Sequence, residues 1–245
     1  MLNYAEYYKN ISSSYNKIRL DKEPEYSRTI SIIEAYLFKG AKLLDIGCGT
    51  GAYGAALLKI GYEVVGIDKS TDQLVLAQQI IPAVLGDAVD LPFKNKTFDL
   101  CLMIMMLHQI PSEKRTRVFS EAYRVLNIGG NLIIKTQSHV DLELCAASRF
   151  FPKMLNNNLL RYPEISWLVD YLSNYGKVEV LSTHTVVEYT VDDFLDITKK
   201  RSTTSLAMLN SKEFDNGFNE MEKYYRQFKK VEHNVYHTYV IANKE

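Results

Sequence analysis

The stretch LLDIGCGTGAYG, residues 43–54, joins an apolar run to a glycine-rich turn. Gly47, Gly49 and Gly51 alternate with other residues directly after the apolar run, and a helix-forming segment follows them. A glycine-rich turn between a strand and a helix lets a ligand touch the main chain, and the helix N-terminus supplies free N–H donors. We therefore expect a ligand to lie against the backbone of this turn.

Around this stretch, short apolar runs alternate with segments of helical periodicity. Helices are expected at GAYGAALLKIG, at TDQLVLAQQII, which ends before Pro82, and at SEKRTRVFSEAYRVL. Strands are expected at KLLDIG, EVVGID, AVLGD, FDLCLMI and, after a turn at Gly129 and Gly130, GNLIIKTQ. Continuously apolar strands separated by helices indicate a parallel sheet with both faces covered, which is a doubly wound α/β fold.

Beyond residue 137 two further segments, KVEVLSTHTV and NVYHTYVIAN, have strand character, which brings the expected sheet to seven mostly parallel strands. The second is expected inside or at the edge of that sheet. Residues 140–176 and 192–230 are predicted to be helical and to form a lid over the C-terminal ends of the strands. Residues 1–40 are predicted to form a helical flap, which leaves 41–245 as the main domain with its lid.

Length, charge and cysteine content narrow the class of protein. The 245 residues suit one sizeable core, and 29 basic side chains balance 29 acidic ones, which does not favour nucleic-acid binding. Cys48, Cys101 and Cys145 are odd in number and widely spaced, so we expect neither a disulfide framework nor a metal site. The same cysteine pattern fits a reducing cytoplasm. The N-terminal MLNYAEYYKN lacks the apolar core of a signal peptide, so we expect none. The longest apolar run, 100–107, is too short to span a membrane.

Three acidic residues at strand ends indicate the character of the ligand. Asp45 lies two residues before Gly47, where it favours a ligand that carries an ammonium or sulfonium group. Asp68 ends EVVGID and can accept hydrogen bonds from both hydroxyls of a ribose. Asp87, in LGDAVDLPF, suits an amino group such as that of adenine.

A dinucleotide site is the competing interpretation of the same turn. Gly49, Gly51 and Gly54 have the GxGxxG spacing of nucleotide-binding loops, and both interpretations use Asp68. A nicotinamide-dependent dehydrogenase does not require Asp87, and the negative charge of Asp45 disfavours a pyrophosphate at this position. The acids therefore favour a cationic adenosyl ligand.

The segments LLDIGCGTG, VVGIDKS, LGDAVDLPF, FDLCLMIMMLHQI and AYRVLNIGGNLII resemble the successive motifs of class I S-adenosylmethionine-dependent methyltransferases, over about residues 40–137. SYNKIR is similar to the helix that closes over the cofactor in many small-molecule members. KKRSTTSLAMLN and EFDNGFNEM resemble the tail of a bacterial subset. The resemblance implies a Rossmann-like fold, S-adenosylmethionine as cofactor and methyl transfer as the reaction.

The resemblance also implies which residues hold the cofactor. The methionine end is expected at Asp45 and Gly47, the ribose at Asp68, and the adenine at Asp87 and Ala88. The other expected cofactor contacts are Cys48, Gly49, Gly51, Lys69, Met103 and Ile104. The run MIMML makes this wall more apolar than in many members of the family, which carry polar residues there.

The transfer of an activated methyl group needs alignment, exclusion of water and, for some acceptors, a base. His108 is the candidate base because its ordinary pKa lies near neutrality; the equally weighted alternative is that it only caps a helix or orients a loop. Tyr15 and Arg19 are expected to close the front of the site, with Tyr15 steering the acceptor; packing of one helix is the alternative for Tyr15.

Arginines in the lid segments are candidates for binding the acceptor. Arg149, Arg161 and Arg201 could bind a carboxylate or a phosphate, and the alternative is that they are solvated or paired with acids. The leading functional hypothesis is methyl transfer to a small molecule or a short peptide. A tRNA or rRNA methyltransferase and a non-catalytic S-adenosylmethionine-binding protein remain the alternatives.

Overall fold

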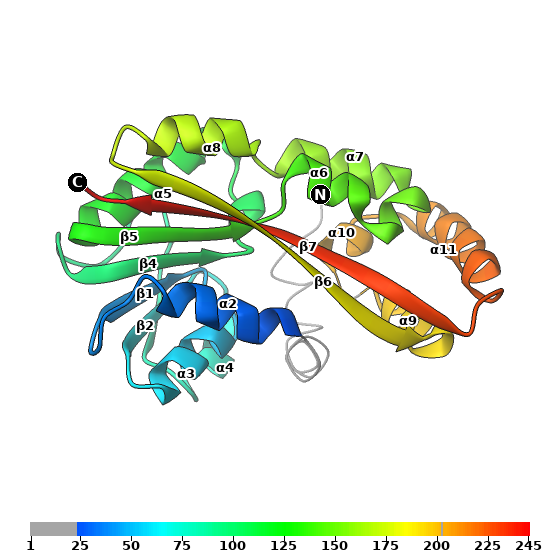
Figure 1. Ribbon diagram of the computed structural model, residues 1–245, viewed down its shortest axis with the longest axis horizontal. Helices are drawn as coiled ribbons and strands as arrows, with labels where there is room; N and C mark the ends of the chain where they lie inside the picture. Colours follow the sequence, from blue (N-terminus) through cyan, green and yellow to red (C-terminus); the bar gives the residue numbers. More distant parts are fainter. Residues whose placement is uncertain (1–23, 202) are drawn as a thin grey trace.

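The apolar runs form one seven-stranded sheet in the computed structural model, which describes residues 24–201 and 203–245 (Figure 1). The strand order is β3–β2–β1–β4–β5–β7–β6, and among these described strands β7 alone runs in the direction opposite to the others. The strands are β1 (Lys42–Ile46), β2 (Glu63–Asp68), β3 (Ala83–Leu85), β4 (Phe98–Ile104), β5 (Leu126–Thr136), β6 (Val178–Thr190) and β7 (Lys230–Asn243).

The topology confirms the predicted doubly wound, mostly parallel α/β fold. The C-terminal strand β7 lies inside the sheet, between β5 and β6, and β6 forms the edge. The strand order reverses between β1 and β4. In open α/β sheets, ligands bind beyond the carboxyl ends of the strands at such a reversal.

Helices cover both faces of the sheet, so strand β1 is buried on both sides and its sequence is mostly apolar. Leu43 and Leu44 are both fully buried, but because successive strand residues point to opposite faces they enter two different apolar clusters. Leu44 packs with residues of α5 and α8, and Leu43 with residues of α2 and α3. The helices around the sheet are α2 (Pro24–Glu34), α3 (Ala52–Lys59), α4 (Thr71–Ala77), α5 (Ser112–Val125) and α8 (Ile165–Leu172).

Two local boundaries differ from the sequence-based prediction. Helix α4 ends at Ala77, and residues 78–81 form a turn, because Pro82 disfavours helical backbone in the residue before it. The expected turn at Gly129 and Gly130 lies within β5, where the pairing with β4 shifts register between Phe98 and Leu100 and the extra residues bulge out. Gly129 has a φ of 77°, which a glycine adopts without strain.

A second lobe is built on the part of β6 and β7 that extends beyond the sheet. Only residues 238–243 of β7 pair with β5, while β6 and β7 pair along their whole length. Helices gather on this two-stranded extension (Figure 1) around an apolar cluster that includes Phe151, Phe194 and Phe214. They are α6 (His139–Leu144), α7 (Pro152–Arg161), α9 (Val191–Lys199), α10 (Thr204–Ala207) and α11 (Ser211–Tyr225).

The helices of this lobe, which we call the lid lobe, fall within residues 139–225 and so mostly within the ranges predicted for the lid, whose covering role stays a prediction. Helix α8, which falls within the predicted lid range 140–176, packs on the sheet instead. Its Leu168 and Leu172 are four residues apart, so they share one helix face, and both are fully buried in the main core with Phe119. The apolar face of α8 therefore assigns it to the main lobe.

A buried polar cluster attaches α2 to strands β5, β6 and β7. Glu25 of α2 is 1% exposed, and its carboxylate lies 3.2 Å from both Lys135 Nζ and His237 Nδ1. The hydroxyls of Tyr239 and Thr185 donate to the same carboxylate over 2.9 and 3.0 Å. Burial alone raises the pKa of Glu25, but the bond from His237 and the charge of Lys135 outweigh it and hold this pKa well below its ordinary value.

We expect Glu25→Gln to lower the free energy of unfolding by about 3–5 kcal/mol, because the buried ammonium of Lys135 loses the carboxylate charge of Glu25 beside it. The double variant Glu25→Gln with Lys135→Met removes both charges and should be less destabilised. Since the pKa of Glu25 is depressed in the folded state, its stabilisation is complete at neutral pH and is lost as the pH falls below about 4.

Urea unfolding at pH 7 measures these differences, with the exposed Glu34→Gln on the same helix as the matched control. Equal stability of wild type and Glu25→Gln at pH 7 would show that the cluster does not anchor α2.

Candidate functional site

The glycine turn lies at the carboxyl end of β1, at the reversal of strand order. Gly47, Gly49 and Gly51 have φ angles of 73°, 57° and 80°, a region that favours glycine. A Cβ on Gly47 would also lie only 2.9 Å from the Cβ of Met106. The turn is thus packed against the segment after β4 without room for a side chain at Gly47.

Asp45 is a buried acid in the middle of the sheet. It lies in β1 opposite Gly66 of β2 and Leu102 of β4 and is 2% exposed. Among residues 24–201 and 203–245, no side chain or backbone N–H donates a hydrogen bond to its carboxylate, and no cation pairs with it. Burial, and then the negative charge of Asp68, raise the pKa of Asp45 to about 7.

Asp68, at the end of β2, fixes the conformation of the glycine turn. Its carboxylate accepts a hydrogen bond from the Gly49 N–H over 2.8 Å and another from the Ser70 N–H over 2.9 Å. The first bond joins the turn to β2, and the second fixes the start of α4, which Ser70 caps. The adjacent Lys69 is exposed. Asp68 therefore places a half-buried carboxylate directly beside the turn.

Asp87 and Ala88 follow β3, the next strand outward from β2. Asp87 is exposed, and its carboxylate accepts a hydrogen bond from the Val89 N–H over 3.2 Å. Ala88 is buried and belongs to the main core. The two residues extend the same edge of the sheet beyond Asp68.

The side chains near the glycine turn point in different directions. Cys48 turns toward β2, since its Sγ lies 2.7 Å from where a Cβ of Gly66 would be, and burial raises the pKa of its thiol. Met103 is fully buried in the main core, and Ile104 is partly buried on the opposite face of the sheet. The methionine that abuts the turn is Met106, which the sequence analysis did not single out.

Two tyrosines that the sequence analysis also missed stand beside the turn. Tyr26 of α2 donates a hydrogen bond to the carbonyl of Ala52 over 2.8 Å, and its ring lies 5.0 Å from that of Tyr53. Burial, and then the charge of Asp45, raise the pKa of Tyr26. The position of Tyr53 two residues after Gly51 was the available signal, whereas the contact with Tyr26 depends on the packing of α2.

His108 follows β4 in the short 3₁₀ helix η1 (Leu107–Gln109). It is 7% exposed, and its ring stacks on that of Tyr162 with the centroids 4.3 Å apart and the planes 8° from parallel. The carbonyl of Tyr162 lies 3.1 Å from His139 Nε2 at the start of α6. His108 is thus oriented where the main lobe meets the lid.

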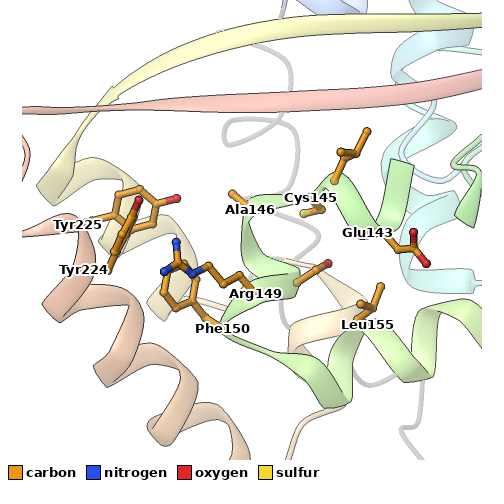
Figure 2. A pocket seen from close by; sticks show the side chains of 10 residues that line it. Glu143, Cys145, Ala146, Arg149, Phe150, Leu155, Tyr224 and Tyr225 are labelled. Atoms are coloured by element: carbon orange, nitrogen blue, oxygen red, sulfur yellow. The ribbon is translucent and has the colours of Figure 1, made fainter. Parts of the chain in front are cut away.

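The arginines proposed for the acceptor have different surroundings. Arg201 donates to the Leu209 carbonyl over 3.0 Å and lies 3.9 Å from the ring centroid of Phe214, so it contributes to packing within the lid. Arg149 is exposed and borders a cavity (Figure 2). Tyr15 and Arg19, proposed to close the front of the site, lie outside the described residues.

The described part of the chain contains neither a metal-binding cluster nor a membrane-spanning helix. No group of three or more His, Cys, Asp or Glu side chains in it could hold a metal ion. No helix in it is long and apolar enough to cross a membrane.

Because the pKa of Asp45 is raised in the folded state, the ligand-free protein should lose stability as the pH rises from about 4 to about 7, by roughly 2–4 kcal/mol. Asp45→Asn should remove this loss and be more stable than wild type at pH 8. Urea unfolding of ligand-free protein at pH 5 and pH 8 tests this, with Asp72→Asn on α4 as control. An unchanged pH dependence in Asp45→Asn would contradict it.

Known proteins share both the sequence motifs and the fold. A family model described as a methyltransferase domain matches residues 44–134. The demethylmenaquinone methyltransferase of Lactiplantibacillus plantarum is 31% identical over 174 residues, which cover 64% of this chain and 73% of that protein. The chain spans only 50–61% of the length of three further relatives.

Two solved structures show the same fold. A putative methyltransferase from an antibiotic biosynthesis pathway of Anabaena variabilis has a TM-score of 0.68 at 20% identity, over 88% of this chain and 96% of that chain. The phosphoethanolamine N-methyltransferase 2 of Haemonchus contortus, in complex with phosphomonomethylethanolamine and S-adenosylhomocysteine, has a TM-score of 0.64 at 18% identity, over 98% of this chain and 58% of that chain. The family model, the relative of Lactiplantibacillus plantarum and the fold agree. The chain belongs to the class I S-adenosylmethionine-dependent methyltransferases.

Proposed function

We propose that this protein transfers the methyl group of S-adenosylmethionine to a small molecule or a short peptide bound between the glycine turn and the lid. The observation that carries the proposal is the buried Asp45 carboxylate, which has no cationic partner among the described residues and lies beside a turn that contains three glycines. A ligand with a cationic end supplies the missing charge, whereas a pyrophosphate would be repelled. The site therefore suits this cofactor.

The residues around the turn would divide the cofactor between them. Asp45 and the backbone at Gly47 would hold the methionine end, Asp68 would accept the ribose hydroxyls, and Asp87 with Ala88 would face the adenine. In support, both oxygens of the Asp68 carboxylate, which already accept backbone N–H groups, keep acceptor capacity for the two hydroxyls. Cys48, Gly49, Gly51 and Lys69 would contribute through the shape of the turn and its surroundings.

The wall opposite the turn would be apolar. Met106 abuts Gly47, so we assign to it the contact that the sequence analysis gave to Met103 and Ile104. Because the Met103 side chain lies in the core, it could reach a ligand only through its backbone. An apolar wall excludes water from the reacting atoms and so favours a direct transfer.

When bound, S-adenosylmethionine supplies an activated methyl group. The protein then has to align the acceptor and, where the acceptor carries a proton, remove it. His108 would accept that proton, because its ring is oriented by Tyr162 at the junction between the two lobes. A purely structural role in the same stack is the alternative for His108.

We infer the class of acceptor from the net charge of the chain and from the names of similar proteins. The balance of 29 basic and 29 acidic side chains does not favour a tRNA or rRNA substrate. Two of the proteins reported above, a demethylmenaquinone methyltransferase and a phosphoethanolamine N-methyltransferase, are each named after a small molecule. We infer a cytoplasmic location from the three cysteines, none of which forms a disulfide within the described residues.

The test is the formation of S-adenosylhomocysteine when purified protein is mixed with S-adenosylmethionine and either demethylmenaquinone or phosphomonomethylethanolamine, with RNA as a third acceptor. Turnover with a small molecule and none with RNA supports the proposal. Turnover with RNA that weakens steeply with salt would favour the alternative.

Asp68→Ala should weaken the binding of S-adenosylhomocysteine by about 10- to 100-fold, because it removes charge-assisted hydrogen bonds to the ribose and to Gly49. Titration calorimetry measures the affinity, and circular dichroism checks the fold. Asp72→Ala, one turn into α4, is the matched control and should bind as wild type does. Unchanged affinity in Asp68→Ala would remove Asp68 from the cofactor site.

His108→Ala should lower kcat by about 10²- to 10⁴-fold and leave the affinity for S-adenosylhomocysteine within about twofold of wild type, because a base acts on the acceptor and not on the cofactor. Steady-state kinetics with an accepted substrate and calorimetry measure the two quantities. Tyr162→Phe keeps the stacked ring and should stay active. A fully active His108→Ala would leave only the structural role.

A further inference from the structure

A cavity in the lid lobe lies outside the residues assigned to the cofactor. It has a volume of about 460 Å³ and opens between the end of α6, the 3₁₀ helix η2 (Ala146–Arg149) and the end of α11 (Figure 2). This volume falls within the range of small-molecule sites. The cavity is bordered by Cys145, Arg149, Phe150, Leu155, Tyr224 and Tyr225, among other residues.

The position of the cavity relates it to the methyl-transfer site. Helix α6 begins three residues after the end of β5, which lies at the same edge of the sheet as the glycine turn, and its last residue Leu144 borders the cavity. Six helical residues span about 9 Å. The cavity is therefore separated from the carboxyl edge of the sheet by helix α6, which suits it to a part of the acceptor other than the accepting atom.

Arg149 gives the cavity a positive charge that is available to a ligand. Its guanidinium carbon lies 4.6 Å from the ring centroid of Tyr224 and 5.6 Å from that of Phe150, so the flat face of the group stacks on aromatic rings. Within residues 24–201 and 203–245, its N–H groups make no hydrogen bond and no ion pair. Glu143, at the other side of the cavity in Figure 2, does not pair with it.

The wall around Arg149 is aromatic. The ring of Phe150 lies 5.6 Å from that of Tyr224 and 5.9 Å from that of Tyr225, and the two tyrosine rings meet edge to face at 5.0 Å. Three neighbouring rings offer flat apolar surface at low entropic cost, and a guanidinium beside them binds carboxylates, sulfonates and phosphates with two parallel hydrogen bonds.

We propose that this cavity binds the distal part of the methyl acceptor, and that this part is a planar apolar group that carries an acidic substituent. The inference rests on the proposed function for the identity of the occupant as an acceptor. Arg149 binds the acidic substituent, and Phe150, Tyr224 and Tyr225 pack against the planar group. Arg149 thereby selects among acceptors without contacting the transferred methyl group.

The test uses a pair of fluorescent probes that differ in charge. 8-Anilinonaphthalene-1-sulfonate is a planar acid, and N-phenyl-1-naphthylamine is its neutral counterpart. Arg149→Gln should weaken binding of the acid about tenfold and leave binding of the neutral probe within about twofold, while Tyr224→Leu should weaken both. Lys153→Gln, an equal change of charge on the neighbouring exposed surface of α7, is the control and should change neither.

Equal affinity of wild type and Arg149→Gln for the sulfonate would overturn the proposal, and so would an equal loss for the neutral probe. Arg149→Lys keeps the charge but lacks the planar guanidinium, so we expect a loss of affinity for the sulfonate smaller than that of Arg149→Gln. This variant is the test if Arg149→Gln does not fold. With an acceptor that is turned over, the sulfonate should raise KM for the acceptor and not for the cofactor; the reverse pattern would also overturn it.

The affinity for S-adenosylhomocysteine, measured on the same variants, separates this inference from the proposed function. If the cofactor affinity is normal and the affinity for the sulfonate is the same in wild type and Arg149→Gln, the acceptor subsite is refuted and the proposed function is not. An absence of cofactor binding in wild type refutes the proposed function and, with it, the identification of the occupant as an acceptor.

Discussion

The organisation of the site depends on a carboxylate that the protein buries without a counter-charge from its described residues. Asp45 lies in β1, an inner strand with neighbours on both sides, and only 2% of the residue is exposed to water there. Its raised pKa expresses that cost. In the proposed function, a cationic ligand beside the glycine turn would remove this cost, so the affinity for the ligand and the lower stability of the empty protein would have the same origin. Such a site trades stability of the empty protein for binding.

The turn that receives this ligand is held from three sides. Asp68 binds its backbone from β2, Met106 abuts it from the segment after β4, and Tyr26 bonds to the carbonyl of Ala52 just beyond it. Tyr26 is adjacent to Glu25, whose buried carboxylate anchors α2 to the far strands of the sheet. The position of the first helix and the shape of the cofactor turn are therefore coupled through two neighbouring residues.

The parts of the fold that could be predicted from sequence are those set by local pattern. Buried parallel strands are apolar on both faces, as Leu43 and Leu44 illustrate, and strand ends place Asp45 and Asp68 at one edge. What could not be predicted depends on contacts between distant segments. Met106 was missed because only the packing of the segment after β4 brings it to Gly47, and α8 was placed in the lid because its periodicity does not reveal which lobe its apolar face meets.

The same distinction applies to the arginines of the lid. Arg149 and Arg201 were both candidates on charge alone, yet Arg201 is occupied by Phe214 and the Leu209 carbonyl, while Arg149 borders a cavity. The lobes share β6 and β7, two continuous strands that cross from the sheet into the lid (Figure 1). Because two continuous strands carry the lid lobe, any movement of this lobe relative to the sheet would have to bend both strands together or rearrange single helices on them.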